Sequence, residues 1–388
     1  MKSVKFTKLI KYLPAIFFTF LLAVGFLANA LNGFKSIRQN LPSRNVSGLE
    51  KDFSDGLFLR NRFINLNGSF AKFMGLKDYY NNKNIYVDSS NYVIGIYPYT
   101  STDYEYEQTV ELYDFLSDNG INLMYVNKPV KYIDDSYPET EFKRESYTNR
   151  NSDLFLKRIR EVGIPAVDLR ENIIADNIDI KEMFYRTDHH WTAPAGFWAT
   201  AVMAENLNKY FGYNIDLSLY DESKYDFIKY DNCWVGEQGQ LISEAYIGRD
   251  NYTLIRPAFD TSYTMTIDGE DTDGDFNLFI NDYTFSDTNV TDMSWHYAYR
   301  MYNTVNHNVD SGKVLILTDS YDQITVPFLS LGVHELNHIQ MRDMPEDFSL
   351  KDYILENGYD TVIISYAQFM IGAHDNPSSA NYRMFSFN

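Results

Sequence analysis

The chain has 388 residues, of which 45% are hydrophobic, 16% are aromatic and 22% are charged. This composition is typical of a folded protein, because disordered chains are poorer in apolar and aromatic side chains. Cys233 is the only cysteine, which excludes a disulfide framework and cysteine-rich zinc or iron–sulfur sites. The formal net charge is −19, and this excess of negative charge argues against a nucleic-acid partner.

Residues 1–31 predict a membrane anchor or a signal peptide. The first 30 residues contain no acidic residue and four lysines, namely Lys2, Lys5, Lys8 and Lys11. From Leu13 to Ala28 the chain is uncharged and almost wholly apolar, which after a basic flank is typical of an exported chain. The run is short for a full span, and Ala28-Asn29-Ala30 resembles a cleavage site, so anchoring and cleavage are both open. We expect an extracytoplasmic protein, held at the cell membrane with its N-terminus inside, or secreted after cleavage behind Ala30.

The rest of the chain divides into two predicted parts. Residues 32–75 predict a stalk with entry helices, because large apolar residues recur there at roughly helical spacing: Leu49, Phe53, Leu57, Leu59, Phe63 and Leu66. In residues 76–388, strands are expected at 91–97, 121–126, 165–169, 313–317, 335–340 and 360–365, and helices at 103–119, 152–162 and 194–211. Apolar strands alternating with helices predict an α/β domain with a flavodoxin-like, doubly wound parallel sheet.

Residues from about 214 to 310 interrupt this alternation. They are rich in Tyr, Thr, Asp, Asn and Gly, and contain short alternating runs at 263–267 and 277–280. We expect a β-rich insertion or an extended lid. The acidic run DGEDTDGD at 268–275 resembles a calcium loop only loosely, since its spacing does not match an EF-hand, and we interpret it as a solvated turn.

Two loops carry the residue types that nucleophilic catalysis requires. Asp188 and His190 lie in the run RTDHHWT ahead of the predicted helix at 194–211, and Ser320 follows the predicted strand at 313–317. Open α/β folds place their sites at the carboxyl ends of strands. Serine needs a base to remove its proton, and the base needs a third group to orient it. Spacing alone makes these three residues a candidate triad, with ordinary hydrogen-bonded loop histidines as the alternative.

The segment FYRTDHHWT resembles the signature of the bacterial DHHW family. That family is similar to the alginate O-acetylation proteins and to other SGNH-hydrolase-like acetyltransferases. The resemblance also covers LEKDFSDGLFLRNRFINL (49–66), MFYRTDHHWTAPAGFWA (183–199) and KVLILTDSYDQITVPFLS (313–330). It implies that Asp188 orients, His190 is the base and Ser320 is the nucleophile, with neither a cofactor nor a metal ion. Thr318 stands where the family's serine block has glycine, which puts the tightness of that turn in question.

Four further residues are candidates for binding substrate or an oxyanion. Tyr321 follows the nucleophile and offers its backbone N–H to an oxyanion. The resemblance implies a role for Arg342, which fits the position of an arginine near the end of the next strand, although a surface salt bridge is the alternative. Lys128 ends the strand at 121–126 and is either a ligand for an anionic substrate or a solvated side chain. Trp191 either packs against the motif loop or stacks on a sugar.

The resemblance implies an exported cell-envelope enzyme that transfers acetyl groups to a polysaccharide or removes them. Transfer implies a separate multi-span membrane protein that supplies acetyl groups from across the membrane. The acidic exported part favours a neutral or weakly charged glycan as acceptor. Two alternatives stay open: a non-catalytic envelope protein that binds glycans or acts as a scaffold, and metal-assisted hydrolysis by Asp188, His189 and His190.

Overall fold

The computed structural model divides the chain into two compact units, Met1–Gly75 and Leu76–Asn388. It describes residues 17–20, 23–27, 29–30, 34–35, 37–38, 59–76, 84–134, 145–281, 285–286, 289–290, 300–372 and 380–387. Most of the predicted anchor lies outside these residues, as do Leu49, Phe53 and Leu57 of the predicted stalk. Within the described ranges, no helix is both long and apolar enough to cross a membrane. The first unit contains helix α3 (Arg60–Phe73).

The second unit is built on an eight-stranded sheet with the order β4-β3-β14-β12-β13-β11-β7-β8. Five neighbouring strands are parallel: β4 (Ala166–Asp168), β3 (Asn122–Lys128), β14 (Thr361–Ala367), β12 (Lys313–Thr318) and β13 (Glu335–Ile339). Their side chains are almost entirely buried, as expected for strands covered on both faces. The predicted α/β class is therefore confirmed. The strand order differs from the flavodoxin order, because the last strand, β14, lies between β3 and β12.

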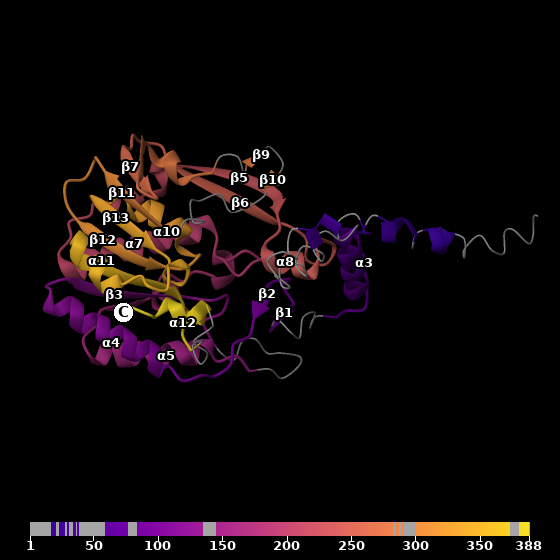
Figure 1. Ribbon diagram of the computed structural model, residues 1–388, viewed down its shortest axis with the longest axis horizontal. Helices are drawn as coiled ribbons and strands as arrows, with labels where there is room; N and C mark the ends of the chain where they lie inside the picture. Colours follow the sequence, from indigo (N-terminus) through magenta and orange to yellow (C-terminus); the bar gives the residue numbers. More distant parts are fainter. Residues whose placement is uncertain are drawn as a thin grey trace, which may run out of the picture. The chain divides into compact units, whose positions relative to one another are not determined.

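Helices cover both faces of this sheet (Figure 1). Successive side chains of a strand point to opposite faces, so Val314 and Ile316 of β12 join one core, while Leu315 and Leu317 join the other. The first core contains α6 (Leu169–Ala175), α7 (Ala193–Phe211) and α10 (Asp322–Leu329). The second contains α4 (Asp103–Asp118), α5 (Thr148–Glu161), α11 (Leu350–Asn357) and α12 (Ala380–Met384). The sheet is thus doubly wound.

The ends of two helices show which boundaries can be predicted from nearby residues and which cannot. Helix α7 begins after Thr192, whose hydroxyl accepts from the Ala195 N–H, and ends at Gly212, which has φ 71°. Both caps follow the usual sequence preferences, so the predicted helix at 194–211 is well placed. Helix α5 begins at Thr148, before the predicted start at 152, because the polar side chains of its first turns are buried by contacts with other elements.

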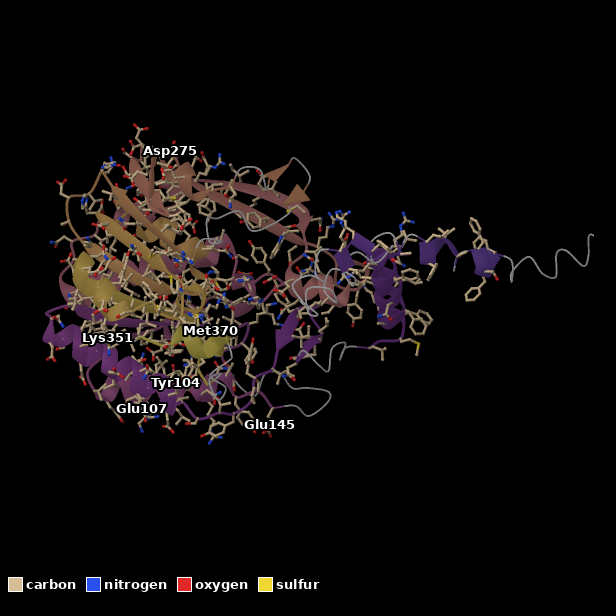
Figure 2. All side chains as sticks on the ribbon, in the orientation of Figure 1. Tyr104, Glu107, Glu145, Asp275, Lys351 and Met370 are labelled. Atoms are coloured by element: carbon tan, nitrogen blue, oxygen red, sulfur yellow. The ribbon has the colours of Figure 1, made fainter. Side chains whose placement is uncertain are left out.

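Part of the insertion at 214–310 belongs to the main sheet and does not form a separate lid. Its strands β11 (Met301–Asn306), β7 (Tyr263–Ile267) and β8 (Glu270–Gly274) extend the main sheet in antiparallel pairs. The interpretation of 268–275 as a solvated turn is therefore wrong for most of that run: only Asp268 and Gly269 form the turn, and β8 follows as an exposed edge strand. Asp275, labelled in Figure 2, caps the 3₁₀-helix η5 (Phe276–Phe279), which takes up most of the alternating run at 277–280.

The remaining elements are small. The predicted strand at 91–97 is the hairpin strand β2 (Val93–Gly95), which pairs with β1 (Ile85–Val87) and not with the main sheet. Strands β5 (Tyr225–Trp234) and β6 (Asp250–Pro257) form a second hairpin, connected through α8 (Glu237–Ile242) and α9 (Glu244–Ile247). The pair β9 (Phe285–Ser286) and β10 (Asn289–Val290) is a third. Short 3₁₀-helices are η2 (Ile180–Met183), η3 (Leu217–Tyr220), η4 (Glu222–Lys224), η8 (Met341–Asp343) and η9 (Gln368–Met370).

Candidate active site

Ser320 lies in the turn between β12 and α10, at the carboxyl edge of the parallel strands. Thr318 is the last residue of the extended strand β12, where the conformational freedom of glycine is not needed. Its hydroxyl lies 2.8 Å from Nδ1 of the buried His338 and 3.3 Å from the Ile339 carbonyl oxygen. The threonine side chain that replaces the family's glycine is thus accommodated by hydrogen bonds to β13.

Asp188, His190 and Ser320 form a continuous hydrogen-bonded relay. Oδ1 of Asp188 lies 2.6 Å from Nδ1 of His190, and Nε2 of His190 lies 2.6 Å from Oγ of Ser320. The backbone N–H of His190 also donates to Oδ1 of Asp188 at 3.0 Å. Both distances along the relay are within hydrogen-bond reach, which is the geometric requirement for a base that activates a nucleophile.

The motif loop and the turn that carries Ser320 are also joined by hydrogen bonds outside the relay. Phe184 and Trp191 form an antiparallel bridge that closes the motif loop. The indole N–H of Trp191 donates to the Tyr321 carbonyl oxygen at 2.9 Å, and the Trp191 side chain is buried. The Tyr321 hydroxyl donates in return to the carbonyl oxygen of His189 at 2.6 Å. The structure therefore gives Trp191 a packing position, the first of the two alternatives.

Residues of the insertion hold Asp188 from the other side. The backbone N–H of Glu237, the first residue of α8, donates to Oδ2 of Asp188 at 2.6 Å. Oδ2 of Asp250 accepts from both the backbone N–H and the hydroxyl of Thr187, while its Oδ1 accepts from the Arg186 N–H. The sequence did not reveal these contacts, because nothing in the insertion marks which distant loop it meets.

Charge and burial act in opposite directions on the motif's ionisable groups. Burial alone raises the pKa of the Asp188 carboxyl, but the charge of His190 and the hydrogen bonds from it bring that pKa well below its usual range. Burial, with the neighbouring His190, lowers the pKa of His189 to about 3. At neutral pH, Asp188 is therefore an anion and His189 is uncharged, which leaves His189 no charge with which to orient substrate.

The structure contradicts both alternatives for Lys128. The side chain is fully buried and neither solvated nor open to a substrate. Its Nζ donates to Asp319 Oδ1 at 2.8 Å, to Asp322 Oδ2 and to the Ser365 carbonyl oxygen at 2.9 Å. Burial, only partly offset by Lys128, raises the pKa of the Asp322 carboxyl. Lys128 braces the turn that carries Ser320, a role that a sequence position at a strand end does not disclose.

The backbone N–H of Tyr321 is not available to an oxyanion, contrary to the prediction. It donates to Oδ1 of Asp319 at 2.9 Å, inside the turn. Arg342 lies in η8, directly after β13, and its Nε is 3.9 Å from Oδ2 of Asp343. No hydrogen bond or ion pair between described residues joins Arg342 to the relay. Its role in substrate binding stays a prediction.

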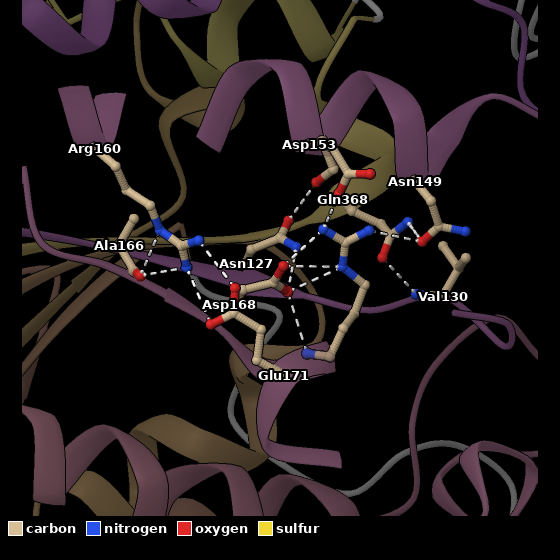
Figure 3. Close-up of polar contacts among 11 residues, drawn as sticks. Asn127, Val130, Asn149, Asp153, Arg160, Ala166, Asp168, Glu171 and Gln368 are labelled. Carbon is tan, nitrogen blue, oxygen red and sulfur yellow. Dashed lines mark hydrogen bonds and ion pairs between the residues drawn. The ribbon is translucent and has the colours of Figure 1, made fainter. Parts of the chain in front are cut away.

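A second polar network lies at the carboxyl ends of β3 and β4 (Figure 3). Asp168 accepts from Asn127 and Arg170, and Arg170 also donates to Asn149 at 3.0 Å. Gln368, which follows β14, donates to the same oxygen of Asn149 at 2.9 Å. This network fixes the start of the loop after β14, next to the Ala367 N–H that donates to Asp319.

The only described cluster with metal-ligating side chains in reach of one another is Asp188, His189 and His190, whose ligand atoms lie within 4.8 Å. Oδ1 of Asp188 is already hydrogen-bonded to Nδ1 of His190 at 2.6 Å and lies 3.3 Å from Nδ1 of His189. A metal ion bound by these three side chains would have to replace the hydrogen bond between Asp188 and His190. The two uses of these side chains are thus mutually exclusive, and a chelator distinguishes them.

The comparisons with known proteins agree with this fold. Residues 103–220 match the family described as an SGNH hydrolase-like domain, acetyltransferase AlgX. This match covers about a third of the chain and agrees with the resemblance and with the acetyltransferase class predicted from the sequence. No curated protein matches it by sequence.

Three solved structures share the fold over most of the chain. The structure of Bacillus cereus PatB1 has a TM-score of 0.63 and 18% identity, covering 78% of this chain and 99% of that one. PatB1 with a sulfonyl adduct gives the same TM-score at 17% identity and the same coverage. A DHHW family protein from Eubacterium siraeum has a TM-score of 0.56 and 16% identity, covering 77% of this chain and 94% of that one. At these identities the likeness concerns the fold.

Proposed function

We propose that this protein is an exported SGNH-type enzyme that transfers acetyl groups to a cell-envelope or secreted polysaccharide through Ser320. One observation carries the proposal: Asp188, His190 and Ser320 make an unbroken relay with two contacts of 2.6 Å. The acetyltransferase description of the matched family favours transfer over hydrolysis. The basic and apolar N-terminal segment favours a place at the outer face of the membrane.

The reaction proceeds in two steps of the same kind. His190 Nε2 takes the proton of the Ser320 hydroxyl as Oγ bonds to the acetyl carbon of the donor, and the leaving group departs with that proton. His190 then removes a proton from an acceptor hydroxyl, whose oxygen bonds to the acetyl carbon. The bond from that carbon to Ser320 Oγ breaks, and Oγ takes the proton back from His190. Asp188 keeps the imidazole oriented and stabilises its protonated form. With a sugar hydroxyl as acceptor the product is an O-acetylated glycan, and with water it is acetate.

Because the active site of an exported enzyme lies outside the cytoplasm, the acetyl group must be brought to it across the membrane. We propose that a separate multi-span membrane protein supplies the acetyl group, as the resemblance to alginate O-acetylation proteins implies. The acidic net charge of −19 favours a neutral or weakly charged glycan as the acceptor, because a polyanion would be repelled.

An esterase assay on the full-length protein in detergent tests the relay. Acetate release from a chromogenic acetyl ester is measured for the wild type, Ser320→Ala and His190→Ala, each with and without a chelator. We expect both variants to lose activity by roughly a thousandfold or more, with no effect of chelator. Activity that survives in Ser320→Ala would sink the proposal, and loss with chelator alone would favour the metal mechanism.

A sulfonyl fluoride probes Ser320 without any need for the natural donor. PatB1 has been solved with a sulfonyl adduct. Here a sulfonyl fluoride would join Ser320 Oγ to sulfur, with loss of fluoride and of the hydroxyl proton to His190. Mass spectrometry of the peptide with Ser320 should show the adduct in the wild type and not in His190→Ala. An unlabelled wild type that also lacks esterase activity would favour the non-catalytic alternative.

A further inference from the structure

Helix α3 carries an exposed apolar stripe that the catalytic proposal does not explain. Five large side chains are between 43% and 85% exposed: Leu59, Phe63, Leu66, Phe70 and Phe73. At about 100° per residue, the four within the helix fall within about 80° of its circumference, and Leu59 precedes them at the N-cap. On the opposite side, Gly68 is buried. Soluble proteins seldom expose such a continuous apolar surface, and where they do it marks an interaction site.

The charge of α3 indicates what covers the stripe. The helix contains Arg60, Arg62 and Lys72 and no acidic residue, although the chain as a whole has 53 acidic and 34 basic residues. An amphipathic helix with Phe and Leu on one face and Arg and Lys elsewhere is typical of helices that lie in the interface of a bilayer. Basic side chains near such a surface attract anionic headgroups.

A second copy of the chain fits the stripe less well. The five residues follow one another in steps of four and three, which is the spacing of a coiled-coil seam. The described helix spans only about two heptads, however, and a stable coiled coil takes roughly three or four. The neighbours of the seam also lack the opposite charges that pair two helices, since every charged residue of α3 is basic.

We propose that α3 lies on the surface of an anionic lipid bilayer, with its Phe and Leu side chains inserted among the acyl chains and its basic side chains at the headgroups. This contact is separate from any anchor in residues 1–31. It goes beyond the proposed function, because it would hold the start of the catalytic unit close to the membrane whether or not Ser320 is reactive.

The lone cysteine makes the test direct. Cys233 is buried, so the native full-length protein takes up little thiol reagent, and one engineered cysteine can carry a fluorescent probe. Leu66→Cys places the probe in the stripe, and Lys72→Cys places it about 120° away on the same helix. Each labelled protein is reconstituted into phosphatidylcholine vesicles, with or without phosphatidylglycerol, that contain lipids with a quencher on the acyl chain.

We expect blue-shifted emission and acyl-chain quenching for the probe at Leu66, stronger with phosphatidylglycerol and weaker at high salt, and neither for the probe at Lys72. Replacing Arg60 and Arg62 by Gln should remove the preference for phosphatidylglycerol. Equal quenching at both positions would overturn the proposal. So would a blue shift at Leu66 without quenching by lipid, because that result would mean that protein covers the stripe. The readout does not depend on enzymatic activity, so it stands apart from the esterase assay.

Discussion

Gly236 and Asp188 are in direct contact: a Cβ added to Gly236 would lie 2.3 Å from both Cβ and Oδ2 of Asp188. No larger residue fits at this position without displacing the carboxylate. Next to it, the Glu237 N–H donates to Oδ2 of the same carboxylate. The insertion thus sets the orientation of Asp188, the residue that in turn orients His190.

Gly236→Ala should lower kcat by roughly a hundredfold, because a small displacement of a catalytic group costs about this much. KM should change little, since the Gly236 contact is with Asp188, which orients the base. Ester hydrolysis by the variant, together with its thermal unfolding, separates lost geometry from lost folding. A variant with normal kcat would show that Asp188 does not need this placement.

Glu237→Pro removes one hydrogen bond to Asp188 and little else. Glu237 is the first residue of α8, a position where proline is well tolerated, and its side chain is exposed. A hydrogen bond to a charged group is worth about 1.5–3 kcal/mol, so kcat should fall roughly tenfold to a hundredfold. Glu237→Ala keeps the N–H and is the matched control, for which we expect wild-type activity. Equal activity of the two variants would contradict the assigned role.

Asp250→Asn should weaken the attachment of the motif loop to β6. Asp250 accepts hydrogen bonds from Thr187 and Arg186. The side-chain amide of Asn would turn its own N–H groups toward some of the N–H and O–H groups of these residues, so those hydrogen bonds would be lost. We expect a loss of about 1–3 kcal/mol in the free energy of unfolding, with a fall in kcat. Asp226→Asn, in the exposed part of the neighbouring strand β5, is the control that should change neither. Denaturant titration and the esterase assay give the two readouts.

Lys128→Met should be strongly destabilising, by about 3–5 kcal/mol, because it leaves the carboxylates of Asp319 and Asp322 buried without their cation. Adding Asp322→Asn removes one of those charges and should recover part of the loss. Chemical denaturation of the wild type, the single variant and the double variant checks both steps. A single variant as stable as the wild type would contradict the buried ion pairs.

Lys131 makes stability depend on pH in the alkaline range. It is buried, with Nζ donating to the Val93 carbonyl oxygen at 2.7 Å, and burial lowers its pKa to about 7. In the unfolded chain the same group stays protonated up to about pH 10. Between these values the unfolded state binds more protons, so stability rises with pH by at most about 1.4 kcal/mol per unit.

The measurement is the free energy of unfolding from pH 7 to pH 9.5 for the wild type and for Lys131→Met. We expect the wild type to gain stability relative to the variant across this window, and to lose it as the pH falls through the folded-state pKa. Parallel curves for the two proteins would show that Lys131 is not held in its neutral form. The range stops short of the ordinary titration of tyrosine, which acts in the opposite direction when burial raises its pKa.

Helix α7 and strand β12 show why some elements were predictable from the sequence. Thr192 and Gly212 cap α7 through contacts within a few residues, and the apolar residues of β12 are buried whichever strands flank it. The β-rich character of the insertion was also predictable, but its partners were not, because an alternating pattern does not specify which strand it pairs with. The run at 263–267 joins the main sheet, whereas 91–97 supplies only a small hairpin, and nothing within either run distinguishes the two outcomes.

The α/β class and the three residue types of the relay were predictable from local patterns, since apolar periodicity and the Asp-x-His spacing are properties of short segments. Three features came to light only in the folded chain: Lys128 is buried against Asp319, the Tyr321 N–H is already hydrogen-bonded, and the insertion orients Asp188. Each of these depends on contacts between segments far apart in sequence. Such contacts follow from the strand order and from the burial of whole elements, neither of which any single segment encodes.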